Sequence, residues 1–134
     1  MKFISAEEFL KQDKKVQEVF INWWEPGIGD LFTYKEKDEH DYIEVECIQS
    51  KNRLRTISFA EIIPLLTEGQ LRKFIEDKTG CYIDISHNSM DTCIQLCDKE
   101  NEYPIEEWEW QYLSNDLLQA YWKAAVEIAE HETR

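Results

Sequence analysis

Residues that interrupt regular structure or build simple motifs are scarce in this chain. It has four glycines and three prolines among 134 residues, and the glycines form neither G-x-G-x-x-G nor a P-loop. Its three histidines, His40, His87 and His131, stand outside the H-x-E, H-E-x-x-H and C-x-x-C-H patterns. The sequence therefore carries no motif of a nucleotide-binding, zinc-hydrolase or haem protein, and we predict neither a cofactor nor a catalytic residue.

Targeting and membrane-spanning segments are also missing from the sequence. No apolar region follows the first residues, and no apolar run approaches the roughly 18 residues of a membrane span. This predicts a cytoplasmic protein whose four cysteines are reduced thiols. Cys93 and Cys97 fall on a predicted strand, where four residues span roughly 13 Å, too far for one disulfide or one zinc ion. We therefore predict no metal site.

Positively charged residues are also scarce in the sequence. Lysine and arginine total 15 against 28 aspartates and glutamates, which gives a formal charge of −13 and a pI of about 4.6. Binding to nucleic acid or to an anionic membrane depends on Lys and Arg, so this composition opposes both. It favours a basic protein as partner, or it serves solubility alone.

Apolar residues, by contrast, are plentiful enough for a folded core. Hydrophobic residues make up 43% of the chain and aromatics 13%, so no disulfide or metal is needed to hold it. The predicted order is α-βββ-α-βββ-α, an α+β fold with about six short antiparallel strands and flanking helices. We predict a single domain over residues 1–134, in which an N-terminal half (1–57) and a C-terminal half (58–134) could pack together.

Capping patterns indicate where the helices begin. Helices are predicted over residues 5–24, 59–63, 68–78 and 115–130. The first three start with a capping box: Ser5 with Glu8, Ser58 with Glu61, and Thr67 with Gln70. Asp13 offers an alternative start for a second helix within 5–24. Gly80 is the expected C-cap of the third helix, and Ser114 is the expected cap of the last.

Alternation of apolar and polar residues predicts the strands. They are expected at residues 31–34, 42–48, 54–57, 81–85, 92–97 and 106–112. On the last strand Trp108, Trp110 and Tyr112 share one face, which we predict to be core, while Glu107, Glu109 and Gln111 share the other.

Two helical stretches, IIPLLTEGQLRKFIE (62–76) and LLQAYWKAA (117–125), resemble small uncharacterised proteins of phages and prophages of Gram-positive bacteria. Such proteins often place a three-stranded meander between two helices, as in phage ABA-sandwich domains. The resemblance covers residues 62–129. It implies a phage or prophage origin, a bacterial host cell and an accessory role, and it brings no catalytic or binding residues.

Two acid-rich segments, 36–46 and 98–109, are the main candidate for a binding surface. Each holds six carboxylates and one lysine. Carboxylates on alternate strand residues lie about 6.6 Å apart, and a row of them could imitate a phosphate backbone. The predicted partner-binding residues are Glu36, Asp38, Glu39, Asp41, Glu44, Glu46, Glu102, Glu106, Glu107 and Glu109. Trp24, beside the turn at Pro26, is a candidate interface aromatic.

These observations favour a protein that is not an enzyme. We predict an acidic accessory protein that binds a basic host protein, such as a nuclease or another defence factor, as a DNA mimic. It would touch neither nucleic acid nor membrane directly. One alternative is a homo-oligomeric structural protein that uses its aromatic strand or Trp24 as an interface. Another is a small enzyme that uses the loop from His87 to Asp91. The sequence leaves the partner, the oligomeric state and the strand order open.

Overall fold

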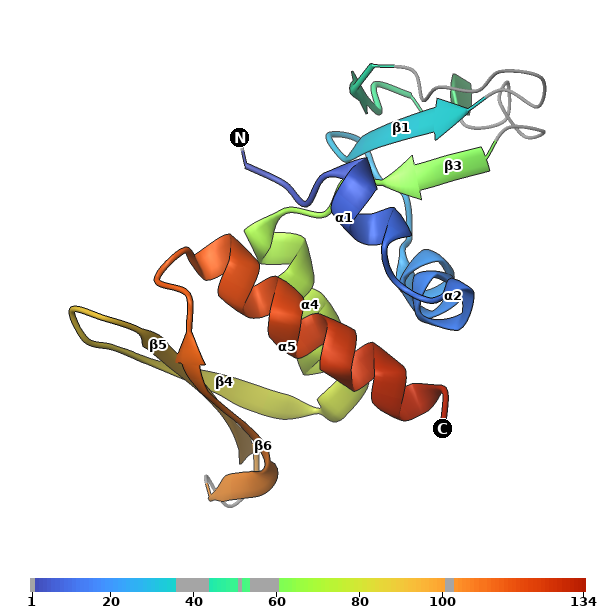
Figure 1. Ribbon diagram of the computed structural model, residues 1–134. Coiled ribbons are helices and arrows are strands. Elements are labelled where there is room, and N and C mark those ends of the chain that lie inside the picture. The colour runs from blue at the N-terminus through green and yellow to red at the C-terminus, as the bar shows by residue number, and fades with distance from the viewer. Residues whose placement is uncertain (1, 36–43, 51, 54–60, 101–102) are drawn as a thin grey trace. The chain divides into compact units, whose positions relative to one another are not determined.

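The computed structural model describes residues 2–35, 44–50, 52, 53, 61–100 and 103–134 (Figure 1). Its helices and two three-stranded antiparallel sheets make an α+β fold, as predicted. The chain divides into two compact units, one formed by Ile4–Leu66 and the other by Met1–Phe3 with Thr67–Arg134. Within the described residues, no helix combines the length and the apolar character that crossing a bilayer requires.

The unit Ile4–Leu66 begins with two helices, so the predicted alternative of a break at Asp13 is confirmed. Helix α1 spans Ala6–Leu10 and α2 spans Lys14–Trp23. The Ser5 hydroxyl caps α1 by accepting from the backbone N–H of Glu8 at 3.2 Å. Gln17 secures the break, because its side-chain amide donates to the carbonyl of Gln12 at 2.8 Å. Its burial is consistent with that role.

The first sheet has the order β2-β1-β3, with β1 (Leu31–Lys35) in the centre, β2 (Glu46–Cys47) and β3 (Glu61–Pro64). The helix predicted over 59–63 is wrong for residues 61–63, which belong to β3. Two β-branched isoleucines favour extended backbone, and Pro64 disfavours helix in the residue before it. Pro64 is tolerated because, among the described residues, β3 pairs with β1 alone.

Other predictions for this sheet meet mixed outcomes. The strand predicted at 54–57 and the start of the strand predicted at 42–48 lie outside the described residues, as do Ser58 and its neighbours in the second capping box. Of the described part of 42–48, only Glu46–Cys47 form a strand. Val45 and Cys47 are exposed, and Ile48 is buried.

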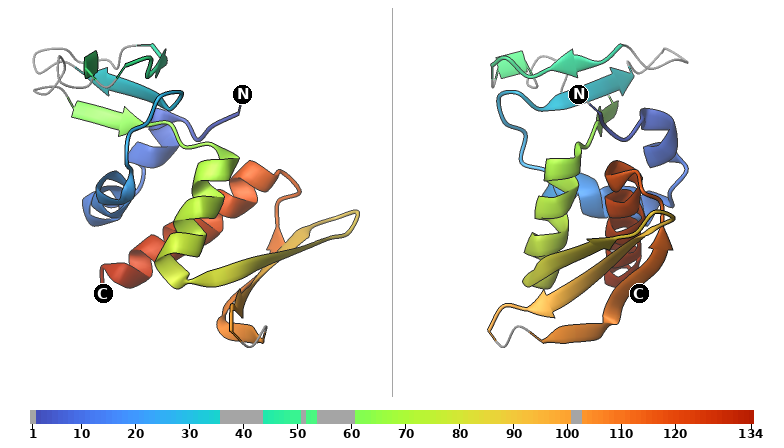
Figure 2. Two further views of the ribbon diagram at one scale, coloured as in Figure 1. Left: turned by 180° about the vertical axis from the view of Figure 1, so that it is seen from behind. Right: turned by 90° about the vertical axis from the view of Figure 1, so that its left-hand side faces the viewer.

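The second unit runs as helix, three-stranded meander, helix. It contains α4 (Glu68–Thr79), β4 (Cys81–His87), β5 (Thr92–Asp98), β6 (Pro104–Leu113) and α5 (Leu117–Glu132), with β5 in the centre of the sheet. Figure 2 shows α4 and α5 on one face of this sheet. On that face Ile94 and Leu96 of β5 are fully buried, and Trp110 lies opposite Ile94.

Local signals set the ends of these helices. Thr67 and Gln70 form the predicted capping box reciprocally, and Gly80 ends α4 in the left-handed conformation with φ 67°. The predicted cap of α5 is wrong by two residues. Asp116 is the N-cap, and its carboxylate accepts from the backbone N–H of Leu118 at 3.0 Å. Ser114 instead accepts from the N–H of Asp116 at 3.1 Å, because a carboxylate at the cap competes well for the free helical N–H groups.

The prediction that Tyr112 joins Trp110 in the core is wrong. Between the pairs Ile94–Trp110 and Thr92–Leu113, β5 advances two residues while β6 advances three. This extra residue is a β-bulge, and it shifts the alternation so that Leu113 is buried and Tyr112 is 82% exposed. Tyr112 adopts φ 59°, a left-handed conformation that is costly for a residue with a side chain.

Relieving this backbone strain should stabilise the unit. We expect Tyr112→Gly to raise the free energy of unfolding by about 0.5–1 kcal/mol, because glycine adopts positive φ without penalty, although it adds entropy to the unfolded chain. The exposed tyrosine ring loses little packing on removal. Urea denaturation followed by circular dichroism measures the change. A loss of stability above about 1 kcal/mol would show that the ring, not the bulge, matters here.

Tyr121 of α5 makes the stability depend on pH at alkaline values. Burial raises the pKa of its hydroxyl, with Arg72 acting in the opposite direction. The unfolded chain ionises this group near pH 10, whereas the folded protein holds it neutral to higher pH. Its contribution is therefore complete below about pH 10 and is lost as pH rises through the folded pKa. We expect Tyr121→Phe to show a shallower fall of the unfolding free energy between about pH 9.5 and 11 than the parent chain.

Candidate functional site: an acidic hollow between β6 and α5

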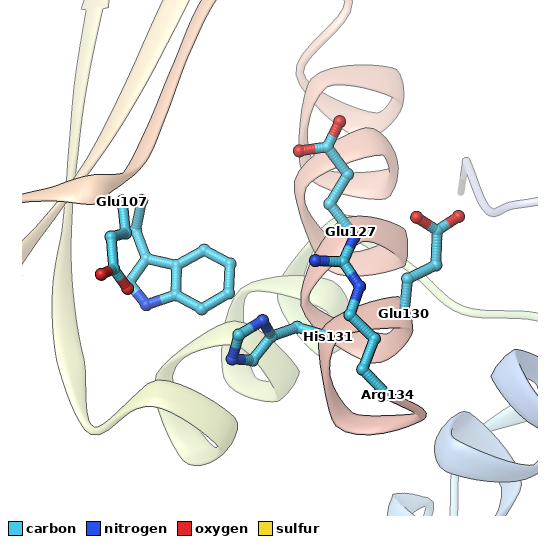
Figure 3. Close-up of a pocket in the computed structure, with 6 residues that line it drawn as sticks. Glu107, Glu127, Glu130, His131 and Arg134 are labelled. Carbon is cyan, nitrogen blue, oxygen red and sulfur yellow. The ribbon is translucent and has the colours of Figure 1, made fainter.

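A hollow of about 680 Å³ lies between the strand β6 and the last turns of α5 (Figure 3). The α5 residues that line it, Glu127, Glu130 and His131, are spaced i, i+3 and i+4, which places them along one side of the helix, and Arg134 follows the end of α5. We call this site the acidic hollow; its lining residues are Glu107, Trp108, Glu127, Glu130, His131 and Arg134.

Contacts between aromatic rings connect the lining of the acidic hollow to the buried core. The Trp108 and Trp110 rings stack at 5.8 Å between centroids, and the edge of His131 meets Trp108 at 5.2 Å with an interplanar angle of 82°. The indole N–H of Trp110 donates to the carboxylate of Glu127. Trp110 is buried and therefore anchors both Trp108 and Glu127 to the core.

Carboxylates dominate the charge of the hollow. Three glutamates face a single guanidinium, that of Arg134. In the part of the chain that the structure describes, Glu107, Glu127 and Glu130 form no ion pair, whereas the neighbouring Glu132 is held by Lys78 at 3.1 Å. A hollow lined by an indole and three carboxylates suits a cationic group, because both the aromatic ring and the acids attract positive charge.

The structure places only part of the predicted acidic surface. Glu36, Asp38, Glu39, Asp41 and Glu102 lie outside the described residues. Glu44 and Glu46 belong to the unit Ile4–Leu66, while Glu106, Glu107 and Glu109 lie on β6 of the other unit. The three glutamates of β6 are exposed, and Glu107 is the predicted residue that lines the hollow.

Glu46 differs from the other predicted acids because its charge is compensated. Both of its carboxylate oxygens accept from the same guanidinium nitrogen of Arg53 at 3.0 Å, and that group also donates to the Tyr34 hydroxyl at 3.2 Å. The hydrogen bond to Glu46, followed by that to Tyr34, raises the pKa of Arg53. This cluster organises the end of the first sheet, so Glu46 contributes little to an attractive field.

Trp24, the candidate interface aromatic, is not available at the surface. Its side chain is 8% exposed, and its indole N–H donates to the carboxylate of Asp30 at 3.1 Å. The same carboxylate oxygen accepts from the backbone N–H of Gly27 at 3.0 Å. Trp24 therefore belongs to the core and fixes the turn between α2 and β1.

The polar loop after His87 is held by its own hydrogen bonds. The Asn88 side chain accepts from the N–H groups of Met90 and Asp91, as a turn-forming asparagine does. His87 Nδ1 lies 3.0 Å from the hydroxyl of Thr92, which donates to Asn115 at 2.9 Å. Thr92 is fully buried, so this chain of contacts connects the hairpin to the start of α5. It gives no support to the enzyme alternative, which stays a prediction.

Sequence reasoning missed the half of the hollow that comes from α5. Nothing in the sequence distinguishes Glu127 and Glu130 from other polar residues of the last helix, and His131 lies beyond residue 130, where that helix was predicted to end. The structure continues α5 to Glu132 and turns His131 toward Trp108. The helical spacing of Glu127, Glu130 and His131 was the available signal, but it shows only that these residues share one side of the helix, not which element lies opposite.

Comparisons with known proteins add nothing to this geometry. No protein-family model, no curated protein and no solved structure matches the chain. Within the described residues, no group of three or more His, Cys, Asp or Glu side chains is arranged to hold a metal ion. The resemblance to phage and prophage proteins stays a prediction, and the interpretation of the site depends on its own chemistry.

Proposed function

We propose that this protein acts by binding a basic surface of another protein, with the acidic hollow as a contact site. The observation that carries the proposal is that three carboxylates, which form no ion pair within the described residues, line one hollow together with Trp108. A lysine or arginine side chain that enters the hollow would meet carboxylates and an aromatic ring together. The net charge of −13 draws such a partner toward the chain.

The proposed partner is a host protein that normally binds nucleic acid, such as a nuclease or another defence factor. The acids of β6 and the hollow would then compete with phosphates for the same basic cleft. The resemblance to phage and prophage proteins supports this choice, because an accessory protein of a phage acts on host machinery. Binding by this mechanism weakens steeply as salt increases.

Capture from a bacterial lysate tests the proposal. The full chain is immobilised and exposed to lysate of a Gram-positive bacterium at low ionic strength, and the eluted proteins are identified. We expect a basic protein that is released by moderate salt and by added DNA or RNA. Recovery of no basic protein at low salt would refute the proposal. Release by salt but not by nucleic acid would refute the imitation of nucleic acid, while the binding of a basic protein would still hold.

A further inference from the structure

The two edge strands of the sheet β4-β5-β6 differ in how well they are protected against pairing with a further strand. At the β6 edge, Pro104 cannot donate a backbone hydrogen bond, register shifts interrupt the strand, and three glutamates project from it. The β4 edge has none of these features. All seven residues of β4 pair with β5 in unbroken register, and its sequence, CYIDISH, contains a single acid, Asp84. Among the described residues, β4 pairs with β5 alone.

The hairpin register shows which backbone groups β4 leaves free. The N–H of Asn88 donates to the carbonyl of Asp91 at 3.0 Å, so these residues form a hydrogen-bonded pair. Such pairs recur at every second residue of an antiparallel ladder. The residues bonded to β5 are then Tyr82, Asp84 and Ser86, and those whose N–H and C=O point outward are Cys81, Ile83, Ile85 and His87. The N–H of Cys81 is already occupied, because it donates to the Thr79 hydroxyl at 3.3 Å. The outward groups of Ile83, Ile85 and His87 have no partner strand among the described residues.

The side chains along the β4 edge could pair with the same side chains of a second copy. Ile83 and Ile85 are half-buried on the side that faces the helices, and Tyr82 and Asp84 lie on the opposite side. Tyr82 is 49% exposed, and the Lys99 ammonium lies 6.0 Å from the centre of its ring. Asp84 is exposed and forms no ion pair within the described residues. An unpaired acid and an available cation therefore flank the same open edge.

We propose that β4 pairs antiparallel with β4 of a second copy of this chain, about a two-fold axis at Ile83. The two sheets would join into one of six strands. Ile83 then faces its own copy, Cys81 faces Ile85, and Tyr82 faces Asp84. The carboxylate of Asp84 from each copy reaches Lys99 and Tyr82 of the other, and the half-buried isoleucines extend the apolar layer across the axis.

The distribution of charge favours a two-fold axis at Ile83 over one at Asp84, and it favours a second copy over a basic partner at the β4 edge. An axis at Asp84 would place two aspartates directly opposite each other, which is destabilising. The axis at Ile83 instead gives two Asp84–Lys99 contacts. Two chains of net charge −13 approach most easily where local acid is lowest, which is β4 rather than β6. A basic partner would be drawn to β6 for the same reason, so the β4 edge suits a second copy.

Analytical ultracentrifugation of the full chain tests this inference. We expect a monomer–dimer equilibrium over about a hundredfold range of concentration. Lys99→Glu should weaken the dimer roughly fivefold, because two exposed ion pairs are lost, and the double variant Lys99→Glu with Asp84→Lys should restore it. Lys123→Glu, at an exposed lysine of α5, is the matched control because it also changes the net charge from −13 to −15, and it should not weaken the dimer. A monomer at every concentration, or a dimer that Lys99→Glu leaves unchanged, overturns the proposal.

Cross-linking gives a second test that does not depend on ion pairs. Hydrogen-bonded antiparallel neighbours have Cα atoms about 5.5 Å apart, which suits a disulfide. Ile83→Cys should therefore form a disulfide between copies at position 83, identified by mass spectrometry after mild oxidation. Asp84→Cys, which faces Tyr82 in this register, should not. Efficient linkage through position 84 and none through 83 would contradict the register. Neither test involves the acidic hollow, so the proposed partner binding stands or falls separately.

Discussion

Trp110→Ala is expected to lower the free energy of unfolding by about 3–5 kcal/mol. The indole is 6% exposed, lies opposite the fully buried Ile94 and stacks on Trp108. Its removal leaves a cavity beneath α5 and deprives Glu127 of the donor that orients its carboxylate. Urea denaturation followed by far-ultraviolet circular dichroism measures the change without relying on tryptophan fluorescence.

Two further substitutions separate the causes of this loss. Trp110→Phe keeps most of the apolar surface but removes the N–H donor, so we expect a cost of about 1–2 kcal/mol. Tyr112→Ala, two residues along the same strand, should change stability by less than about 0.5 kcal/mol because Tyr112 is exposed. If Tyr112→Ala cost as much as Trp110→Ala, the β-bulge would not divide the two aromatics between core and surface as described.

The double reversal Glu107→Lys with Glu130→Lys is expected to weaken binding of the captured basic protein about a hundredfold, near tenfold for each charge. These two residues line the acidic hollow from different elements, Glu107 from β6 and Glu130 from α5 (Figure 3). Glu127 is left in place because it accepts from Trp110 and therefore supports the fold. Isothermal titration calorimetry at two salt concentrations gives both the affinity and its salt dependence.

A control variant with the same net charge distinguishes a site from overall acidity. Glu18→Lys with Glu25→Lys reverses two exposed glutamates of the other unit. Each double variant changes the net charge by +4, from −13 to −9. We expect the control to lose less than about threefold in affinity, since neither of its two glutamates lines the acidic hollow and exposed charges outside a contact are screened by salt. Equal losses in the two variants would mean that the acid acts only through the net charge, and the acidic hollow would no longer be the site.

Local signals in the sequence predicted the second unit well. The capping box at Thr67 and the glycine at position 80 each depend on backbone groups within a few residues, so they predict the ends of α4 reliably. Alternation likewise predicted β4 and β5, because a half-buried strand shows its two faces directly in its residue order. These features need no knowledge of distant contacts.

Predictions failed where two signals competed or where pairing changed the local pattern. Ser58 and Glu61 have the spacing of a capping box, yet Ile62 and Ile63 lie in a strand, paired with Tyr34 and Thr33 of β1. The alternation through Tyr112 was regular in the sequence, but a bulge against β5 reversed its direction. Neither outcome is contained in the few residues around the position, because each depends on a partner strand far along the chain.

The sequence by itself determined the α+β class, the strongly acidic character, the ends of several elements and the aromatic–acidic alternation of β6. These follow from composition and from periodicity, which act over short distances along the chain. Only the tertiary structure decided that Trp24 is core, that Tyr112 is exposed and that Glu107 and Glu130 line the same hollow. The physical reason is that burial and charge compensation depend on which elements pack together, and β6 and α5 contribute to one site only after the sheet has turned them toward each other.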